Sequence, residues 1–349
     1  MNLSELLTLL QQAHSPTDIF GLLAPGDEAA LRQSYRRLAA IAHPDHNPHQ
    51  PAEAHGAFRL LQSWYAAAQR QIGSSPQIMV ATQRDRYVAN GPPIRGDLCD
   101  LYAAEAKDGP VLLKIARSTR NNDLLDAEAT ALRNLSRALD GQPLRAHFPA
   151  LVEHARLRDE AGNERSVNVL HAECDYVSLT EVLRACPRGL PLADAAWMFN
   201  RMLAALGAAH QCGLVYGAVL PAHMLVRPAD HNGMLLDWCY SVPVGQPIKA
   251  ISPPHAADYP PEVAARVPAT PATDLYMAAR VMVRLLGGSG DASTLPEHVP
   301  RSMQALLRSC LLPAPQRRAS DAWQLFDNFR DLLQRHYGPP QFRPFVMPA

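Results

Sequence analysis

The stretch from Ala208 to Asp237 constrains the fold of this chain more than any other. An apolar helix ends near Gly213, a short loop follows, and a β-rich hairpin then leads to the carboxylate of Asp237. The helix from Asp194 to His210 carries Trp197, Met198, Met202 and Leu206, and an apolar stripe of that kind is typical of a packed core. We therefore assign the helix to the core and the loop to a candidate site.

This order of elements resembles the catalytic loop of protein kinases, H-R-D-L-K-P-x-N. The loop here spells YGAVLPAH over residues 216–223. Ala218 stands where the family's proton-accepting Asp would be, and Leu220 where a Lys is common. His223 replaces the Asn that would hold a magnesium ion. Because a methyl group cannot accept a proton, we expect the loop to keep the family's backbone arrangement but not its catalytic activity.

Lys114 interrupts an apolar run at 111–116, in a chain with only two other lysines. The runs at 87–89, 100–104 and 111–116 predict strands, with Asp108-Gly109 as a hairpin turn. A lysine in a buried strand needs a counter-charge. The resemblance implies Glu128, on the next helix, as that partner. A lysine that extends from an edge strand into solvent is the alternative.

A nucleotide site is implied by the same resemblance. The loop that would cover the phosphates keeps only Gly96, so fewer backbone amides can approach a triphosphate. The candidate nucleotide-binding residues are Gly96, Lys114, Glu128, the hinge residues Glu173 and Cys174, and Asp237. ATP with Mg or Mn is the candidate cofactor, with Asp237 as the candidate metal ligand and His223 as a weaker one.

Three later motifs follow in the family's order. Tyr259-Pro260-Pro261-Glu262 resembles A-P-E, Asp274 begins the motif of the following helix, and Arg318 lies near the domain's end. The resemblance implies a buried ion pair between Glu262 and Arg318, which supports the architecture rather than activity. We expect Glu262, Arg318 and Asp274 to be structural residues.

The N-terminal 72 residues show apolar positions at helical spacing, which predicts three or four amphipathic helices. His43-Pro44-Asp45 lies between two of them, preceded by Tyr35-Arg36-Arg37 and followed by Phe58 and Tyr65. From Thr17 to about Gln71 this stretch resembles a J domain of the DnaJ co-chaperone family, except that His46 replaces the usual Lys. The resemblance implies that His43, Pro44, Asp45, Arg36 and Arg37 engage a DnaK-type ATPase.

The histidine cluster His43, His46, His49 and His55 does not predict a metal site. It has no accompanying Cys or paired carboxylate, and a proline-containing loop gives no fixed ligand geometry.

Composition narrows the function classes. With Lys+Arg 33 and Asp+Glu 33, the formal net charge of +0 gives no electrostatic case for nucleic-acid or membrane binding. The six cysteines show no C-x-x-C spacing, which favours reduced thiols. No apolar run reaches membrane-spanning length, and the N-terminus lacks a signal-peptide pattern. We therefore expect a cytoplasmic protein with protein partners.

The predicted fold is α+β: a small all-α J domain followed by a bilobal protein-kinase-like fold. We expect a J domain at 1–72, a linker at 73–77 and a kinase-like domain at 78–337. The last comprises a small lobe, 78–172, and a large lobe, 177–337. The proline-rich tail, 338–349, is expected along the surface or mobile.

The predicted function is that of a J-domain pseudokinase, a co-chaperone or adaptor. It would recruit and stimulate a DnaK-type ATPase, while the kinase-like domain binds an unidentified protein partner and a candidate nucleotide. The alternative is an active, atypical kinase-fold enzyme, a protein kinase or nucleotidyl transferase, that uses Lys114, Glu128 and Asp237. Ala218 and His223 replace the proton-accepting Asp and the metal-holding Asn of the family, which argues against an active enzyme. A third interpretation has the J domain serve only as a docking platform.

Overall fold

The computed structural model describes residues 2–13, 16–20, 28–47, 49–73, 79–82, 84–89, 91–158 and 162–348. The chain forms two compact units. The first comprises Met1–Ile94 and Leu101–Pro110, and the second comprises Arg95–Asp100 and Val111–Ala349. The domain boundaries expected from the sequence remain predictions, and the expected linker lies outside the described residues from position 74 onward.

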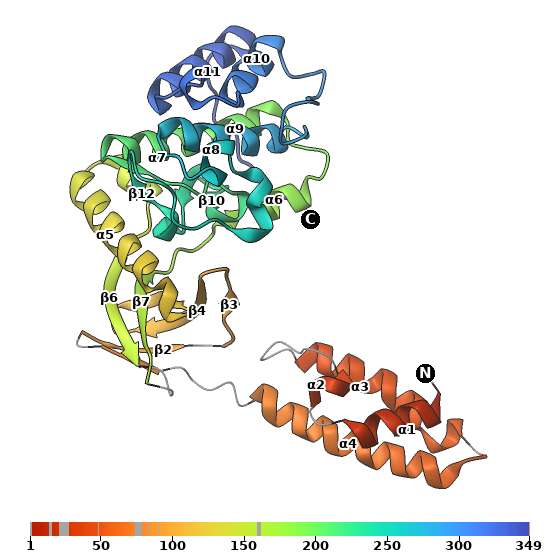
Figure 1. Cartoon of the computed structure of the whole chain (residues 1–349). Coiled ribbons are helices and arrows are strands. Elements are labelled where there is room, and N and C mark those ends of the chain that lie inside the picture. The colour runs from red at the N-terminus through yellow and green to blue at the C-terminus, as the bar shows by residue number, and fades with distance from the viewer. Residues whose placement is uncertain are drawn as a thin grey trace. The chain divides into compact units, whose positions relative to one another are not determined.

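The first unit begins with helices (Figure 1): α1 Leu3–Gln12, α2 Pro16–Phe20, α3 Glu28–Ala42, the 3-10 turn η1 Pro44–His46 and α4 Pro51–Gly73. The start of α1 is fixed by a capping box in which the Asn2 and Glu5 side chains each accept the other's backbone N–H. Leu6, Leu31 and Leu61, from three helices, are at most 1% exposed. The helices expected from the apolar spacing are therefore present, and they share one core.

Short strands follow: β1 Met79–Ala81, β2 Arg86–Ala89, β3 Ile94–Arg95 and β4 Cys99–Ala106. β1 and β2 pair antiparallel, with Val80 opposite Tyr87, and β2 pairs with β4 in the same sense. The next strand, β5, begins at Gly109, whose φ is 120°. The connection is therefore Lys107-Asp108, one residue earlier than predicted, because Gly109 is the first strand residue rather than part of the turn.

The second unit includes β5 Gly109–Ala116 from Val111 onward. β5 pairs antiparallel with β7 Glu164–His171, which pairs with β6 Leu151–Arg158. α5 Asn122–Ala138 packs on β7 and β6 and turns Leu125, Glu128 and Leu132 inward. The 3-10 turns η2 Thr119–Asn121 and η3 Pro143–His147 flank this helix. The register places Lys114 opposite Asn168.

The rest of the unit is mainly helical. Its helices are α6 Leu179–Ala185, α7 Leu192–Gln211, α8 Pro261–Ala264, α9 Pro271–Leu285, α10 Arg301–Cys310 and α11 Ala322–Tyr337. Its strands are β8 Val177–Ser178, β9 Leu214–Val215, β10 Met224–Arg227, β11 Asn232–Leu235 and β12 Val242–Pro243, and its 3-10 turns are η4 Pro221–His223, η5 Trp238–Tyr240, η6 Pro253–Asp258 and η7 Pro315–Arg317.

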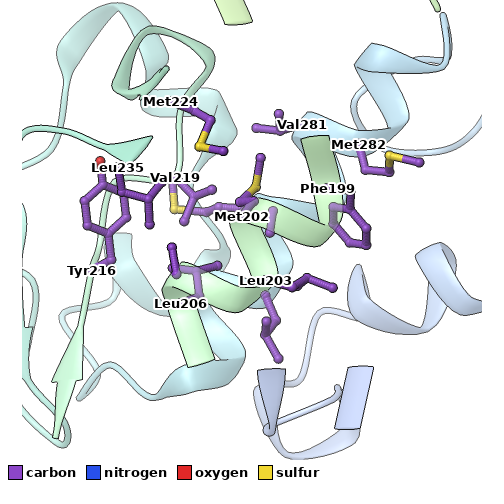
Figure 2. Packing of buried hydrophobic residues seen from close by; sticks show 14 of the residues in the cluster. Phe199, Met202, Leu203, Leu206, Tyr216, Val219, Met224, Leu235, Val281 and Met282 are labelled. Carbon is purple, nitrogen blue, oxygen red and sulfur yellow. The ribbon is translucent and has the colours of Figure 1, made fainter. Parts of the chain in front are cut away.

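The α7 helix is the centre of the large core. Figure 2 shows Phe199, Met202 and Leu206 of α7 beside Met282 of α9 and Val219 of the following loop. The four α7 and α9 side chains have no exposed surface. Because the loop after α7 contributes to this core, its backbone is held in place by packing. In the part of the chain that the structure describes, no helix is both long and apolar enough to cross a membrane.

Candidate functional site

Lys114 lies at the centre of a buried charged cluster. Its Nζ is 2.6 Å from Oε1 of Glu128 on α5, 2.5 Å from Oδ1 of Asp237 and 3.5 Å from Sγ of Cys239. The side chains of Lys114 and Glu128 are each 1% exposed. Lys114 is therefore not a solvated edge residue, and the two residues that the resemblance paired lie in contact.

The charges of this cluster support one another. Burial alone would lower the pKa of Lys114, but Asp237, Cys239 and Glu128 outweigh it and raise that pKa well above its ordinary value. Burial likewise opposes ionisation of Asp237. The Lys114 ammonium and then His223 reverse this effect and hold the Asp237 pKa at about 2. Both groups are therefore charged at neutral pH.

Asn168, which sequence analysis missed, holds Glu128 in position. Its Nδ2 donates to Oε2 of Glu128 at 2.8 Å and to the carbonyl oxygen of Leu125 at 3.0 Å. A ring nitrogen of His154 lies 2.7 Å from the Asn168 Oδ1. Asn168 has no exposed surface and stands between two buried valines on β7. A polar residue inside an apolar strand was the feature that could have indicated this role.

Asp237 is presented by an unusual backbone conformation. It has a φ of 55° and a ψ of 48°, in the left-handed region that non-glycine residues rarely adopt. The turn η5 follows it, and Trp238 there is fully buried, with its Nε1 donating to the carbonyl oxygen of Leu235. This turn fixes the Asp237 carboxylate beside Lys114.

The loop that replaces the catalytic loop is packed rather than polar. Ala218 has no exposed surface and belongs to an apolar cluster with Cys99, Leu125, Cys239 and Tyr240. The methyl group therefore occupies an apolar environment at the position where the resemblance expects a carboxylate.

His223 closes the same loop. Its Nδ1 lies 3.0 Å from the Ala218 carbonyl oxygen, its Nε2 lies 3.4 Å from Oδ2 of Asp237, and its ring stacks on Tyr240. Both ring nitrogens therefore face oxygen atoms of neighbouring residues.

Asp274 anchors the start of the loop at residues 216–223. Its carboxylate accepts the backbone N–H groups of Tyr216 at 2.7 Å and Gly217 at 2.8 Å, and it lies 2.9 Å from Nε2 of His210. Farther along the chain, Arg318 donates to both carboxylate oxygens of Glu262, at 2.6 and 3.1 Å, and both side chains are buried. The three residues expected to be structural thus make buried, charge-assisted contacts.

The Gly96 loop is tied to a distant segment of the second unit. A Cβ at Gly96 would come within 2.8 Å of the Cys99 carbonyl oxygen, so the tight loop requires glycine. The next residue, Asp97, accepts a hydrogen bond from the hydroxyl of Ser252, and the Ser252 N–H donates to the Tyr259 hydroxyl. The Asp97–Ser252 contact, between residues 155 positions apart, was not expected from the sequence.

The chain is similar to one protein kinase in sequence and to one kinase domain in fold. No protein-family model matches the chain. The serine/threonine-protein kinase PknG of Mycolicibacterium smegmatis (strain ATCC 700084 / mc(2)155) is 26% identical over 295 residues, which cover 76% of this chain. The chain spans only 35% of PknG. The crystal structure of the BubR1 kinase domain matches with a TM-score of 0.58 and 19% identity, over 74% of this chain and 84% of that one. The fold is protein-kinase-like.

Two predicted hinge residues lie outside the described cluster around Lys114. Glu173 lines a cavity of about 520 Å³, together with Arg145, Tyr176 and Arg227. Cys174 is exposed in the connection after β7. Of the candidate nucleotide-binding residues, the structure therefore brings together Lys114, Glu128 and Asp237.

The metal-ligating potential of the kinase-like site is limited. Among the described residues, one group of three has donor atoms within 4.8 Å of one another, namely Glu128, Asp237 and Cys239. Lys114 Nζ contacts all three, so an ammonium already lies among them. Mg²⁺ prefers an octahedron of oxygen ligands, whereas the neighbour of the remaining Asp237 oxygen is an imidazole nitrogen. These residues do not fit a two-magnesium site.

The His43-Pro44-Asp45 tripeptide lies between α3 and α4. The His43 ring packs edge-on against Phe58, with centroids 6.1 Å apart, and Asn47 Nδ2 donates to the carbonyl oxygens of Ile41 and His43. Arg36 and Arg37 are exposed on α3. The side chain of Asp45 lies outside the described residues. The turn is therefore held by local contacts, while the two arginines face solvent.

Proposed function

We propose that this chain is a J-domain pseudokinase: a kinase-like scaffold without phosphotransfer, whose N-terminal helices recruit a DnaK-type ATPase. The observation that carries the first part is the environment of Ala218, which is fully buried among Cys99, Cys239 and Tyr240. Phosphotransfer uses a group that orients the acceptor hydroxyl and takes its proton. An apolar cluster at that position has no such group.

The remaining polar groups do not replace it. The Nδ1 of His223 is engaged by the Ala218 carbonyl, and its Nε2 faces Asp237. Lys114 is already surrounded by acceptors, so a nucleotide phosphate would have to displace one of them. These contacts favour a scaffold that maintains the kinase-like fold by itself, with nucleotide as a candidate ligand and not a requirement.

An active, atypical enzyme is the second candidate, because Lys114, Glu128 and Asp237 do lie in contact. Transfer of labelled phosphate or adenylate from ATP, with Mg²⁺ or Mn²⁺, distinguishes the two. We expect no transfer to the chain or to generic protein substrates. Transfer that is present in the wild type and absent in Asp237→Ala would overturn the pseudokinase proposal. A thermal-shift titration with ATP and ADP tests nucleotide binding separately.

The co-chaperone part of the proposal is supported by the tripeptide's position in a short turn and by the exposed arginines beside it. A cationic helix next to this turn suits an acidic partner surface. We propose that the partner is a DnaK-type ATPase in the cytoplasm, which agrees with the six free cysteines.

The test is the stimulated ATPase rate of such a chaperone. His43→Gln should abolish the stimulation, whereas His49→Gln, an exposed histidine in the same connection, should retain it and serves as the matched control. Equal stimulation by the two variants would contradict the co-chaperone proposal. A third outcome is that the wild type binds the chaperone without stimulating its ATPase and that His43→Gln binds it as well. The helices would then serve only as a docking platform.

A further inference from the structure

The C-terminal segment after α11 packs against the rest of the second unit through the rings of Phe342 and Phe345, an ion pair of Arg343 and the partly buried side chain of Met347. Phe345 is 8% exposed and packs edge-on against Trp197, with ring centroids 6.1 Å apart. The ring centroids of Phe342 and His231 are 4.6 Å apart, and Nη2 of Arg343 lies 2.8 Å from Oδ2 of Asp194. The His231 ring also has a hydrogen bond to the Arg343 backbone. The segment has no helix or strand of its own.

The surface under this segment is built by α7 and the turn between β10 and β11. Asp194, Trp197 and Arg201 are three and four residues apart, so they lie on one face of α7. The Trp197 and His231 rings stack 4.1 Å apart with an interplanar angle of 5°, and Arg201 Nε donates to the His231 carbonyl oxygen at 2.7 Å. These contacts join residues of the surface to one another and do not involve the tail. We call Asp194, Trp197 and His231 the tail groove.

The tail leaves polar atoms of this groove unsatisfied. Nε1 of Trp197 and Nε2 of His231 are buried and have no hydrogen-bond partner among the described residues. His231 is 7% exposed as a whole. Buried polar atoms without partners are unfavourable. The tail therefore fits the shape and charge of the groove but not all of its hydrogen-bonding groups.

Few side chains of the tail are buried against the groove. Phe345 is its one buried ring, whereas Phe342 is 64% exposed, Val346 is 78% exposed and the Arg343 side chain is 53% exposed. A segment with one buried ring and one partly buried methionine is held chiefly because its attachment to the chain keeps its effective concentration high. A free peptide that offers the same ring and charge, with partners for the two orphaned atoms, can compete with it.

We propose that the tail groove is a peptide-docking site that Phe342-Arg343-Pro344-Phe345 occupies in cis, and that a partner protein's extended segment of the type aromatic-Arg-Pro-aromatic occupies in trans. Asp194 selects the basic residue, and the Trp197 face receives the second aromatic ring. The inference rests on the proposed scaffold function, because it names the chemical class of the partner that the scaffold binds.

The experiment uses full-length chains and a fluorescein-labelled peptide with the sequence of residues 338–348. Fluorescence anisotropy should show at least tenfold tighter binding to a full-length Phe345→Ala chain than to the wild type, because the variant frees the groove. A peptide with its own Phe345→Ala change should not bind. A peptide with Val346→Ala, a change at a mostly exposed position, should bind like the parent peptide.

A charge exchange tests the ion pair. Asp194→Lys in the Phe345→Ala chain should weaken binding of the parent peptide at least tenfold. A peptide with Arg343→Glu should bind this double variant with the original affinity. Should the Phe345→Ala chain fail to fold by its melting transition, Arg343→Glu in the full chain replaces it, since that change breaks only the ion pair.

Equal peptide binding to the wild type and the tail variant, or no binding to either, would overturn the proposal. Wild-type dimers that dissociate on Phe345→Ala would also overturn it, because the occupant would then be the tail of a second copy. The labelled-phosphate assay does not involve the groove. A negative peptide result with no phosphotransfer therefore rejects the groove and leaves the scaffold proposal standing.

Discussion

The Nδ1 of His223 lies 3.0 Å from the backbone carbonyl oxygen of Ala218. These are the two positions at which the kinase resemblance expects a metal-holding Asn and a proton-accepting Asp. Here they contact each other, and the contact closes the loop whose first two backbone N–H groups, of Tyr216 and Gly217, donate to Asp274. The loop thus keeps its shape through interactions that need neither nucleotide nor metal.

Lys114→Met should destabilise the second unit strongly. The change leaves the buried Glu128 carboxylate and the partly buried Asp237 carboxylate without their cation, and breaking a buried ion pair costs about 3–5 kcal/mol. Denaturant unfolding measures the loss. The control is Lys249→Met, whose ion pair with Asp123 at 3.6 Å is mostly exposed and should contribute less than about 1 kcal/mol. Equal stability of the two variants would show that the cluster around Lys114 is not stabilising.

Sequence analysis identified one of the two buried polar residues of the sheet that meet at Glu128, namely Lys114, and missed the other, Asn168. Lys114 stood out in an apolar strand, and the family order led from it to Glu128 and Asp237. The packed cluster around Ala218 could not be predicted, because it combines residues from β4, β5, α5 and η5. Only the tertiary fold brings these segments together.

Two further contacts could not be predicted from the sequence for the same reason. Asp97 and Ser252 meet although 155 positions separate them, and neither belongs to a motif. The tail was expected to lie along the surface or to be mobile, from its prolines. The proline content does not predict that Phe345 is buried against Trp197. Local patterns predicted elements and family order, whereas side-chain partners across the chain required the structure.

Glu262→Gln tests the second buried ion pair. The variant keeps the side chain's size but leaves the Arg318 guanidinium, fully buried in the native chain, without its counter-charge. We expect a loss of about 3–5 kcal/mol in unfolding free energy. Asp327→Asn is the matched control, because its pair with Arg330 is more than half exposed and should contribute less than about 1 kcal/mol. A loss no larger than the control's would contradict this role.

Thiol labelling tests whether the cluster around Ala218 is closed in solution. Burial raises the pKa of Cys99 to about 12, and Cys239 is buried with its pKa raised well above normal, whereas Cys174 is exposed. Only the thiolate reacts, and a pKa of about 12 leaves roughly 0.1% thiolate or less as the pH rises from 7 to 8.5. Mass spectrometry after maleimide treatment should therefore find Cys174 modified first. Rapid modification of Cys99 at pH 7 would show that the cluster opens readily.

Ala218→Asp tests whether the loop can be returned to a catalytic form by one residue. The new carboxylate would be buried among Cys99, Cys239 and Tyr240, so its ionised form lacks both solvent and a free cation. We expect a loss of several kcal/mol in unfolding free energy and no gain of phosphate transfer from labelled ATP. Ala222→Asp is the matched control, because Ala222 is exposed in the same loop and should change stability by less than about 0.5 kcal/mol. If Ala218→Asp were as stable as that control and transferred phosphate, the site would be a kinase centre that lacks only its base.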